Sequence, residues 1–220
     1  MLADKSGTPL IVHCAKNAMA AACVDHVCIA SDSESIEAAA TAAGIDHRLT
    51  RGDHPNGTSR IAEIADSLEA DIIVNVQGDE PELDPSTIDA AIDALRCDPD
   101  AGIATVAAPC TDPTHVDDVN VVKVVVDQAS RAIYFSRAPI PCDRDGAGVE
   151  YLRHVGLYVY TPEALHDYVQ LPPGVLEQTE QLEQLRLLEH ARPIAVARVE
   201  TCHCGIDTPQ QYEDWLQRRA

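Results

Sequence analysis

Residues 71–81, DIIVNVQGDEP, place a short apolar run two residues before a pair of carboxylates. The run is rich in β-branched residues, which predicts a strand buried on both faces, as in a parallel sheet. It breaks at Gly78 and continues into Asp79 and Glu80. Ligands of open α/β sheets bind beyond the carboxyl ends of the strands, and Mg²⁺ prefers oxygen donors such as carboxylates. A plain turn explains this segment equally well, because Gly, Asp and Pro are ordinary turn residues.

The charge of the chain limits its partners. The 220 residues carry a formal net charge of −20, and 4% of them are aromatic. Such a surface repels nucleic acid and anionic lipid, and few aromatic side chains are present to stack on bases. We therefore expect neither nucleic acid nor a membrane as a partner. An anionic small-molecule substrate would need a local basic pocket.

Eight cysteines raise the question of disulfides or zinc. The sequence has no apolar export segment near Met1 and no long apolar span, which favours a reducing cytoplasm over an oxidising compartment. The tightest cluster is Cys202-His203-Cys204, and no C-x-x-C pair accompanies it. Structural zinc sites pair two well-spaced sets of ligands. We therefore interpret the cysteines as free thiols.

Strand-like and helix-like segments alternate along the chain, which predicts βαβ units in one α/β domain over residues 1–220. The final helix has the clearest start, because Thr208 can cap it, Pro209 suits its first position and Gln211 completes a capping box. The predicted helices cover residues 9–23, 33–43, 59–68, 86–95, 162–169, 176–189 and a segment from 209. The predicted strands cover residues 27–30, 72–76, 103–107, 121–126, 132–135, 152–160 and 194–199.

Six blocks of sequence, in order along nearly the whole chain, resemble one enzyme family. The blocks are residues 51–63 (RGDHPNGTSRIAE), 75–81 (NVQGDEP), 134–145 (YFSRAPIPCDRD), 152–160 (LRHVGLYVY), 182–188 (LEQLRLL) and 205–209 (GIDTP). Their combination is similar to 3-deoxy-manno-octulosonate (KDO) cytidylyltransferase, the CMP-KDO synthetase family. The resemblance implies a Rossmann-like nucleotide-diphospho-sugar transferase fold, with a mostly parallel central sheet flanked by helices and a sheet extension used for dimerisation. It also implies a homodimer, Mg²⁺, and CTP and KDO as substrates.

The block around Gly57 corresponds to the family pattern H-x-S-G-T-E-R. Gly57 permits close approach of a ligand, a helix starting there would aim N–H groups at an anion, and Arg60 offers planar donors. A simple helix cap with a surface arginine is the alternative. The chain departs from the pattern at Asn56 and Ser59. The resemblance implies a nucleotide site formed by Gly57, Thr58, Arg60, Gln77 and Asp79.

Two aspartates match the metal-binding positions of the family, Asp79 and Asp207. Each follows a predicted strand, so one sheet edge could bring them together. Mg²⁺ is commonly held by one or two carboxylates together with substrate phosphates. Asp207 could instead cap the last helix, since Asp is a favoured N-cap residue. The two roles are compatible if Thr208 is the cap.

The resemblance implies a sugar-acid site formed by Arg137, His154, Tyr158, Glu183 and Gln184. Arginine suits bidentate binding of a carboxylate. His154 and Tyr158 should point to one face of their strand, because side-chain direction repeats every two residues. A half-buried strand histidine and a glutamate on a solvated helix face are the alternative interpretations of His154 and Glu183.

The family opens with a strand and a P-A-R-x-x-S-x-R-L-P-G-K-P loop, and residues 1–10 resemble only the family segment that comes after this loop. We therefore expect the chain to begin late relative to the family. The implied reaction transfers CMP from CTP to KDO, for lipopolysaccharide biosynthesis. Two alternatives stay open: a cytidylyltransferase for another sugar acid, such as a nonulosonate, and a catalytically inactive paralogue that binds nucleotide and forms dimers.

Overall fold

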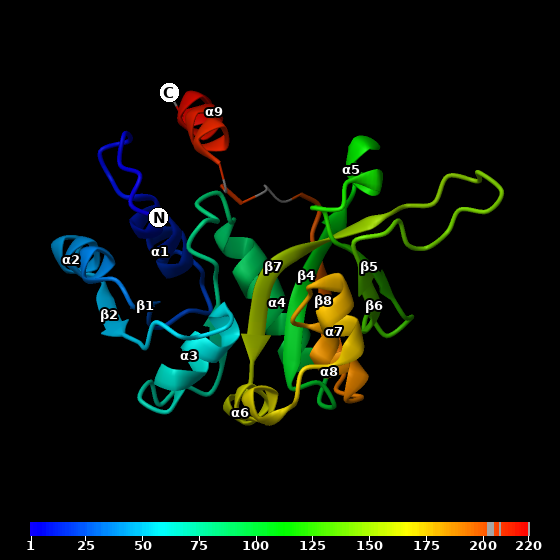
Figure 1. Ribbon diagram of the computed structural model, residues 1–220, viewed down its shortest axis with the longest axis horizontal. Coiled ribbons are helices and arrows are strands. Elements are labelled where there is room, and N and C mark those ends of the chain that lie inside the picture. The colour runs from blue at the N-terminus through cyan, green and yellow to red at the C-terminus, as the bar shows by residue number, and fades with distance from the viewer. Residues whose placement is uncertain (202–204, 207, 220) are drawn as a thin grey trace. The chain divides into compact units, whose positions relative to one another are not determined.

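The computed structural model describes residues 1–201, 205–206 and 208–219 (Figure 1). Its helices and strands alternate, as expected for the α/β class. The chain divides into two compact units. The first contains Met1–Leu68, Asn75–Asp89 and the described part of Cys202–Ala220, and the second contains Glu69–Val74 and Ala90–Thr201. The single domain expected over residues 1–220 remains a prediction.

The first unit holds a two-stranded parallel sheet and its helices. Its elements are α1 (Leu10–Met19), β1 (Cys28–Ser31), α2 (Glu34–Ala42), β2 (Asp46–Leu49), α3 (Gly57–Ala65) and α9 (Pro209–Arg219). Apolar side chains of α1, β1 and α2 form a buried core that includes Val12, Ile29 and Ala40. The strand β2 was not predicted, because three of its four residues are polar and none is buried, so they give no apolar alternation.

The predicted capping box at the start of α9 is confirmed. The backbone N–H of Gln211 donates to Thr208 Oγ1 at 3.2 Å, and Gln211 Oε1 accepts from the backbone N–H of Thr208 at 2.8 Å. The helix begins at Pro209, as predicted. Its apolar face buries Trp215 completely in a cluster with Leu10 of α1.

The second unit contains most of a six-stranded sheet formed by the described residues. Its elements are β4 (Ile103–Pro109), α5 (Thr114–Asp117), β5 (Lys123–Val126), β6 (Ala132–Ser136), β7 (Leu152–Tyr160), α6 (Pro162–Gln170), α7 (Val175–Glu180), α8 (Leu185–Glu189) and β8 (Ile194–Arg198). Two further elements, β3 (Ile73–Asn75) and α4 (Pro85–Cys97), cross the boundary between the units. The strand order is β6-β5-β7-β4-β8, and β3 pairs with β7.

This sheet is mixed, so it holds more antiparallel pairs than the mostly parallel sheet we expected. Strands β4 and β8 are parallel, whereas β7 runs antiparallel to both β4 and β5, and β5 runs antiparallel to β6. The antiparallel pairs follow from how the strands are connected. Strands β5 and β6 form a hairpin, and the long loop over residues 137–151 leads the chain back into β7. That loop projects from the sheet at the right of Figure 1.

Strand β7 carries an irregularity in its pairing with β4. Thr105 faces Tyr158, but the next residue of β4, Val106, faces Val155. Gly156 and Leu157 are therefore extra residues on β7 without a partner position on β4. Bulges of this kind bend a strand and redirect side chains.

The single helix predicted over residues 176–189 is wrong. The segment forms two short helices, α7 and α8, because Gln181 adopts a left-handed conformation with φ 54° that ends α7. Leu182 and Leu185 are buried, whereas Leu188 is only partly buried.

The described cysteines agree with the interpretation as free thiols. Six of them form no disulfide within the described residues, and Cys202-His203-Cys204 lies outside those residues. No group of three or more His, Cys, Asp or Glu side chains in the described part of the chain is arranged to hold a metal ion. None of the described helices is both long and apolar enough to span a bilayer.

Candidate active site

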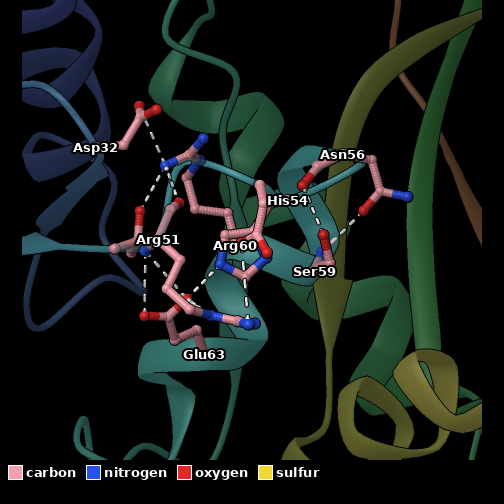
Figure 2. Close-up of polar contacts among 9 residues, drawn as sticks. Asp32, Arg51, His54, Asn56, Ser59, Arg60 and Glu63 are labelled. Atoms are coloured by element: carbon pink, nitrogen blue, oxygen red, sulfur yellow. Dashed lines mark hydrogen bonds and ion pairs between the residues drawn. The ribbon is translucent and has the colours of Figure 1, made fainter.

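The N-terminus of α3 is capped by the two residues that depart from the family pattern. Asn56 is the N-cap, and its Oδ1 accepts a hydrogen bond from the backbone N–H of Ser59 at 2.9 Å (Figure 2). The Ser59 hydroxyl donates to the backbone carbonyl of Asn56, also at 2.9 Å. Thr58 between them is fully buried. Asn56 and Ser59 thus stabilise the start of the helix that presents Gly57.

Arg60 of α3 is anchored through one of its terminal nitrogens. Its Nη1 donates to Thr50 Oγ1 at 2.5 Å and to the backbone carbonyl of Arg51 at 3.3 Å. The same nitrogen lies 3.3 Å from a carboxylate oxygen of Asp32 (Figure 2). Within the described residues, Nε and Nη2 are not used in these bonds, so they can donate to a ligand.

Glu63, one turn further along α3, organises the loop before the helix. Its carboxylate accepts from the backbone N–H and from Nε of Arg51, each at 3.3 Å, and it contacts Nε2 of His54 (Figure 2). The hydrogen bond from His54 is the main reason that the pKa of Glu63 lies below its ordinary value. Sequence reasoning missed Glu63 as part of this network, although it closes the quoted block 51–63.

Gly57 and Gln77 lie together. A Cβ atom placed on Gly57 would lie 3.3 Å from Gln77 Nε2 and 3.8 Å from Asn75 Nδ2, so a side chain would crowd the Gln77 amide and contact that of Asn75. Gln77 Nε2 donates to Asn75 Oδ1 at 3.0 Å. Asn75 is buried, and its Nδ2 has no hydrogen-bond partner among the described residues. A buried donor of this kind is costly unless a ligand or water satisfies it.

Asp79 lies beside Ile206, shortly before α9. Its backbone carbonyl accepts from the N–H of Ile206 at 2.8 Å. A Cβ atom on Gly205 would lie 3.3 Å from a carboxylate oxygen of Glu80. Asp79 and Glu80 are both half-buried. The other expected metal ligand, Asp207, lies outside the described residues.

The surroundings of Asp79 are strongly negative. The buried thiol of Cys14 donates to the backbone carbonyl of Gly78 at 3.0 Å, and its pKa is raised to about 12 by burial and, in second place, by the charge of Asp79. Glu80 adds to this effect. A divalent cation would offset this charge, and carboxylates are suitable donors for Mg²⁺, so the residues present fit that metal.

Gly78 lies close to a side chain of α1. A Cβ atom there would lie 2.4 Å from Cδ1 of Ile11, which belongs to α1. The missing side chain therefore leaves room for the end of the Ile11 side chain beside the turn after β3.

In the second unit, Arg137 donates to three backbone carbonyls. Its Nε donates to Glu180 and its Nη1 to Val119, each at 2.8 Å, and its Nη2 donates to Gln181 at 3.3 Å. A guanidinium has five N–H donors. Among the described residues, these bonds leave one N–H on each terminal nitrogen. The arginine is held in place while still able to donate two hydrogen bonds to a carboxylate.

Lys123 of β5 contacts the backbone of Arg137, and this structural role was not predicted from the sequence. It is fully buried, and its Nζ donates to the backbone carbonyls of Asp118, Val121 and Arg137 at 2.9, 2.6 and 2.7 Å. Burial lowers its pKa from the ordinary value. The sequence signal was a single lysine inside the apolar run 121–126, where a charged side chain needs internal partners.

His154 and Tyr158 of β7 contact each other, with ring centroids 5.4 Å apart. Phe135 of β6 packs edge-on against His154 at 5.0 Å, and His154 Nε2 lies 2.9 Å from Thr105 Oγ1. Burial lowers the pKa of His154 to about 3, although the residue keeps partial exposure. Its imidazole is therefore neutral at physiological pH. The contact agrees with the prediction that both side chains point to the same face of the strand.

Glu183 and Gln184 lie in the turn that joins α7 to α8. Glu183 accepts a hydrogen bond from the Tyr168 hydroxyl at 3.4 Å, and its charge is the second cause, after burial, of the raised pKa of Tyr158. Gln184 is buried, and its Nε2 has no hydrogen-bond partner among the described residues. Glu183 is half-buried, so it does not lie on a fully solvated helix face. All five expected sugar-site residues belong to the second unit.

Comparison with known proteins identifies the class and then the family. Residues 1–194 match the family model described as cytidylyltransferase, so the chain is a nucleotidyltransferase of that class. It is 46% identical over 214 residues to the 3-deoxy-manno-octulosonate cytidylyltransferase of Solibacter usitatus, covering 97% of this chain and 85% of that protein. It is 45% identical over 217 residues to the enzyme of the same name from Syntrophobacter fumaroxidans, covering 96% and 87%. The chain belongs to the 3-deoxy-manno-octulosonate cytidylyltransferase family.

Solved structures agree with this assignment. The fold matches that of CMP:2-keto-3-deoxy-manno-octonic acid synthetase complexed with CTP, with a TM-score of 0.94 and 37% identity over 100% of this chain and 92% of that one. HddC from Yersinia pseudotuberculosis matches with a TM-score of 0.67 at 14% identity, which supports the fold alone. The resemblance and the α/β fold class predicted from the sequence are thereby confirmed.

Proposed function

We propose that this chain transfers CMP from CTP to the anomeric hydroxyl of KDO, giving CMP-KDO and pyrophosphate. The observation that carries the proposal is the likeness of the whole chain, at a TM-score of 0.94 and 37% identity, to a synthetase solved with CTP. The curated relatives with 45–46% identity carry the name of the same activity.

The first unit would bind the nucleotide. The N-terminus of α3 offers backbone N–H groups to an anion, and Gly57 leaves room for its approach. Nε and Nη2 of Arg60 would donate to the nucleotide, while Nη1 keeps the side chain in place. Thr58, which is buried between Asn56 and Ser59, would support this helix end from within, and the Gln77 amide lies beside Gly57, where a ligand at the helix end would meet it.

Asp79 and Asp207 would hold Mg²⁺. No three-ligand cage is needed, because Mg²⁺ is usually bound by one or two carboxylates together with substrate phosphates and water. Glu80 follows Asp79 directly, and a divalent cation would offset the charge of these neighbouring carboxylates. When bound, the cation would neutralise phosphate charge and favour ionisation of the attacking hydroxyl.

The second unit would bind the sugar acid. The two remaining N–H groups of Arg137 suit the KDO carboxylate, because they lie on the two terminal nitrogens of one planar group. Neutral His154 and buried Tyr158 would contact the sugar, and Nε2 of Gln184, which has no partner in the described part of the chain, would donate to a hydroxyl. Glu183 would accept from another hydroxyl.

The reaction needs positioning more than covalent chemistry. The anomeric oxygen forms a bond to the α-phosphorus of CTP, the bond from that phosphorus to the bridging oxygen of the β-phosphate breaks, and pyrophosphate leaves. The hydroxyl proton passes to solvent. Arg60 and Arg137 would orient the two substrates, and orientation of bound reactants can supply a large part of a rate enhancement.

Three wider features belong to the same proposal. The chain would act in the cytoplasm, where CTP is available, and its product would feed lipopolysaccharide biosynthesis. It would form a homodimer through its sheet extension. The exposed apolar side chain of Ile133 on β6 supports a subunit contact there, since a second subunit would remove it from water.

Pyrophosphate release from CTP, with KDO or a nonulosonate as acceptor, tests the proposal. We expect release with KDO, and a loss of at least about 100-fold in Asp79→Asn with unchanged circular dichroism. Asp93→Asn, an exposed carboxylate on α4, is the control and should keep full activity. Isothermal titration of CTP with and without Mg²⁺ gives a second readout, because Asp79→Asn should lose the metal-dependent part of binding.

Each alternative function has its own outcome. Release with a nonulosonate but not with KDO would identify another sugar-acid cytidylyltransferase. CTP binding without turnover of either acceptor would favour an inactive paralogue. Retention of most activity by Asp79→Asn would refute the metal assignment and leave the reaction itself standing.

A further inference from the structure

The hydroxyl of Thr105 lies between the irregular part of β7 and the ring of His154. Thr105 is fully buried on β4. Its Oγ1 lies 2.7 Å from the backbone carbonyl of Leu157, 3.4 Å from that of Val155, and 2.9 Å from His154 Nε2. Leu157 is one of the two extra residues of β7, so its position has no partner residue on β4.

Counting protons fixes which atom donates. A threonine hydroxyl has one proton and two lone pairs, and a carbonyl oxygen can only accept. The Leu157 carbonyl is the nearest acceptor, and it would be left without this bond if the hydroxyl proton pointed at the imidazole. The hydroxyl therefore donates to Leu157, and His154 Nε2 must carry a proton that it donates to Oγ1.

The second ring nitrogen of His154 is then an acceptor. A neutral imidazole carries one N–H, and the hydrogen bond at one nitrogen decides the state of the other. The ring is neutral because burial lowers the pKa of His154 to about 3. Its ring neighbours are Phe135 and Tyr158, and the described residues provide no hydrogen bond to Nδ1. The residue keeps partial exposure, so a ligand can reach it.

We propose that Thr105 is a positioning residue that holds His154 in the Nε2–H tautomer, so that Nδ1 accepts a hydrogen bond from a hydroxyl of the sugar substrate. The substrate part of this inference rests on the proposed function. It gives the site a preference: a hydroxyl can donate to Nδ1, whereas a methoxy group or a hydrogen atom at the same place cannot. A site built to pair a substrate hydroxyl discriminates against analogues that lack it.

Nitrogen-15 NMR of histidine-labelled protein tests the tautomer without substrate. Wild-type His154 should show one protonated nitrogen, Nε2, coupled to both ring carbon protons, and one unprotonated nitrogen, Nδ1, from about pH 5.5 to 8. The signal is assigned by its absence in His154→Gln. A wild-type signal with the proton on Nδ1, or with both nitrogens protonated, would overturn the proposal whether or not any Thr105 variant folds.

Two variants of Thr105 test the positioning role. Thr105→Val removes the hydroxyl, and Thr105→Ser keeps it. We expect Thr105→Val to show a mixture of tautomers and a KM for KDO raised about tenfold, the factor that corresponds to one modest hydrogen bond, with the KM for CTP unchanged. Thr105→Ser should restore both the single tautomer and the KM.

The outcomes separate this inference from the proposed function. An unchanged single tautomer in folded Thr105→Val would refute the role of Thr105. A parallel rise in the KM values of both substrates would indicate a merely structural effect and would also refute it. Failure of the wild-type chain to use KDO, with the expected tautomer present, would instead refute the proposed substrate and leave the Thr105–His154 arrangement established.

Discussion

The neutral state of His154 predicts a measurable loss of stability in acid. The ordinary pKa of a histidine is 6.5, and burial lowers that of His154 to about 3. The unfolded chain therefore binds this proton below about pH 6.5, whereas the folded protein binds it only near pH 3. The stabilising contribution is complete above pH 6.5 and is lost as the pH falls from 6.5 toward 3. Integrated from pH 7 to pH 5, the loss is about 2 kcal/mol.

Urea denaturation at pH 7 and pH 5, followed by circular dichroism, measures this contribution. Between pH 7 and pH 5, the wild-type free energy of unfolding changes by the contribution of His154 plus the contributions of all other groups that bind protons. His154→Gln cannot bind the proton in either state, so its free energy of unfolding should fall by about 2 kcal/mol less. Comparing the two pH-dependent losses removes any effect of the substitution on stability that is equal at both pH values.

A matched control uses an exposed residue of the same unit that binds no proton in this pH interval. Gln170 ends α6 and is exposed, so Gln170→Ala should lose as much stability between pH 7 and pH 5 as the wild type. Equal losses for His154→Gln and the wild type would refute the reasoning. They would mean that His154 takes up its proton in the folded protein as readily as in the unfolded chain.

Three further substitutions test the packing and capping of the fold. Lys123→Met removes three buried hydrogen bonds to carbonyls and should lower the free energy of unfolding in urea by about 3–5 kcal/mol; unchanged stability would contradict this. Gly102→Ala brings a Cβ to 2.7 Å from that of Ala164 and should cost about 1–3 kcal/mol, whereas Gly156→Ala, with nothing within 4 Å, should cost far less; equal costs would refute the packing argument. Thr208→Ala should weaken α9 by about 1 kcal/mol, seen as faster hydrogen exchange of its first turns; an unchanged exchange rate would count against the cap.

Local sequence patterns predicted the elements that depend on local chemistry. The strand over residues 152–160 has the predicted bounds, because its second half is rich in valine and tyrosine, which favour strands. The start of α9 was predicted to the residue, since the capping box is formed by side chains three positions apart. The residues of the expected sites came from the resemblance, and the structure brings Gly57 beside Gln77 and His154 beside Tyr158.

The features that the sequence did not predict depend on residues far apart in the chain. The helix over residues 176–189 breaks at Gln181, where the carboxylate of Glu180 accepts from Ser136 and the carbonyls of both Glu180 and Gln181 accept from Arg137. The irregularity of β7 is stabilised by a hydroxyl about fifty residues away, on Thr105. Such contacts cannot be predicted from local propensities, because tertiary hydrogen bonds override the preference of a short segment.

The three backbone bonds of Arg137 have an entropic consequence. A free arginine side chain samples many rotamers, and fixing it costs up to about 2 kcal/mol. Here folding has already fixed the guanidinium against the carbonyls of Val119, Glu180 and Gln181. An anion that docks on its remaining two N–H groups would find them preorganised and would bind without that penalty.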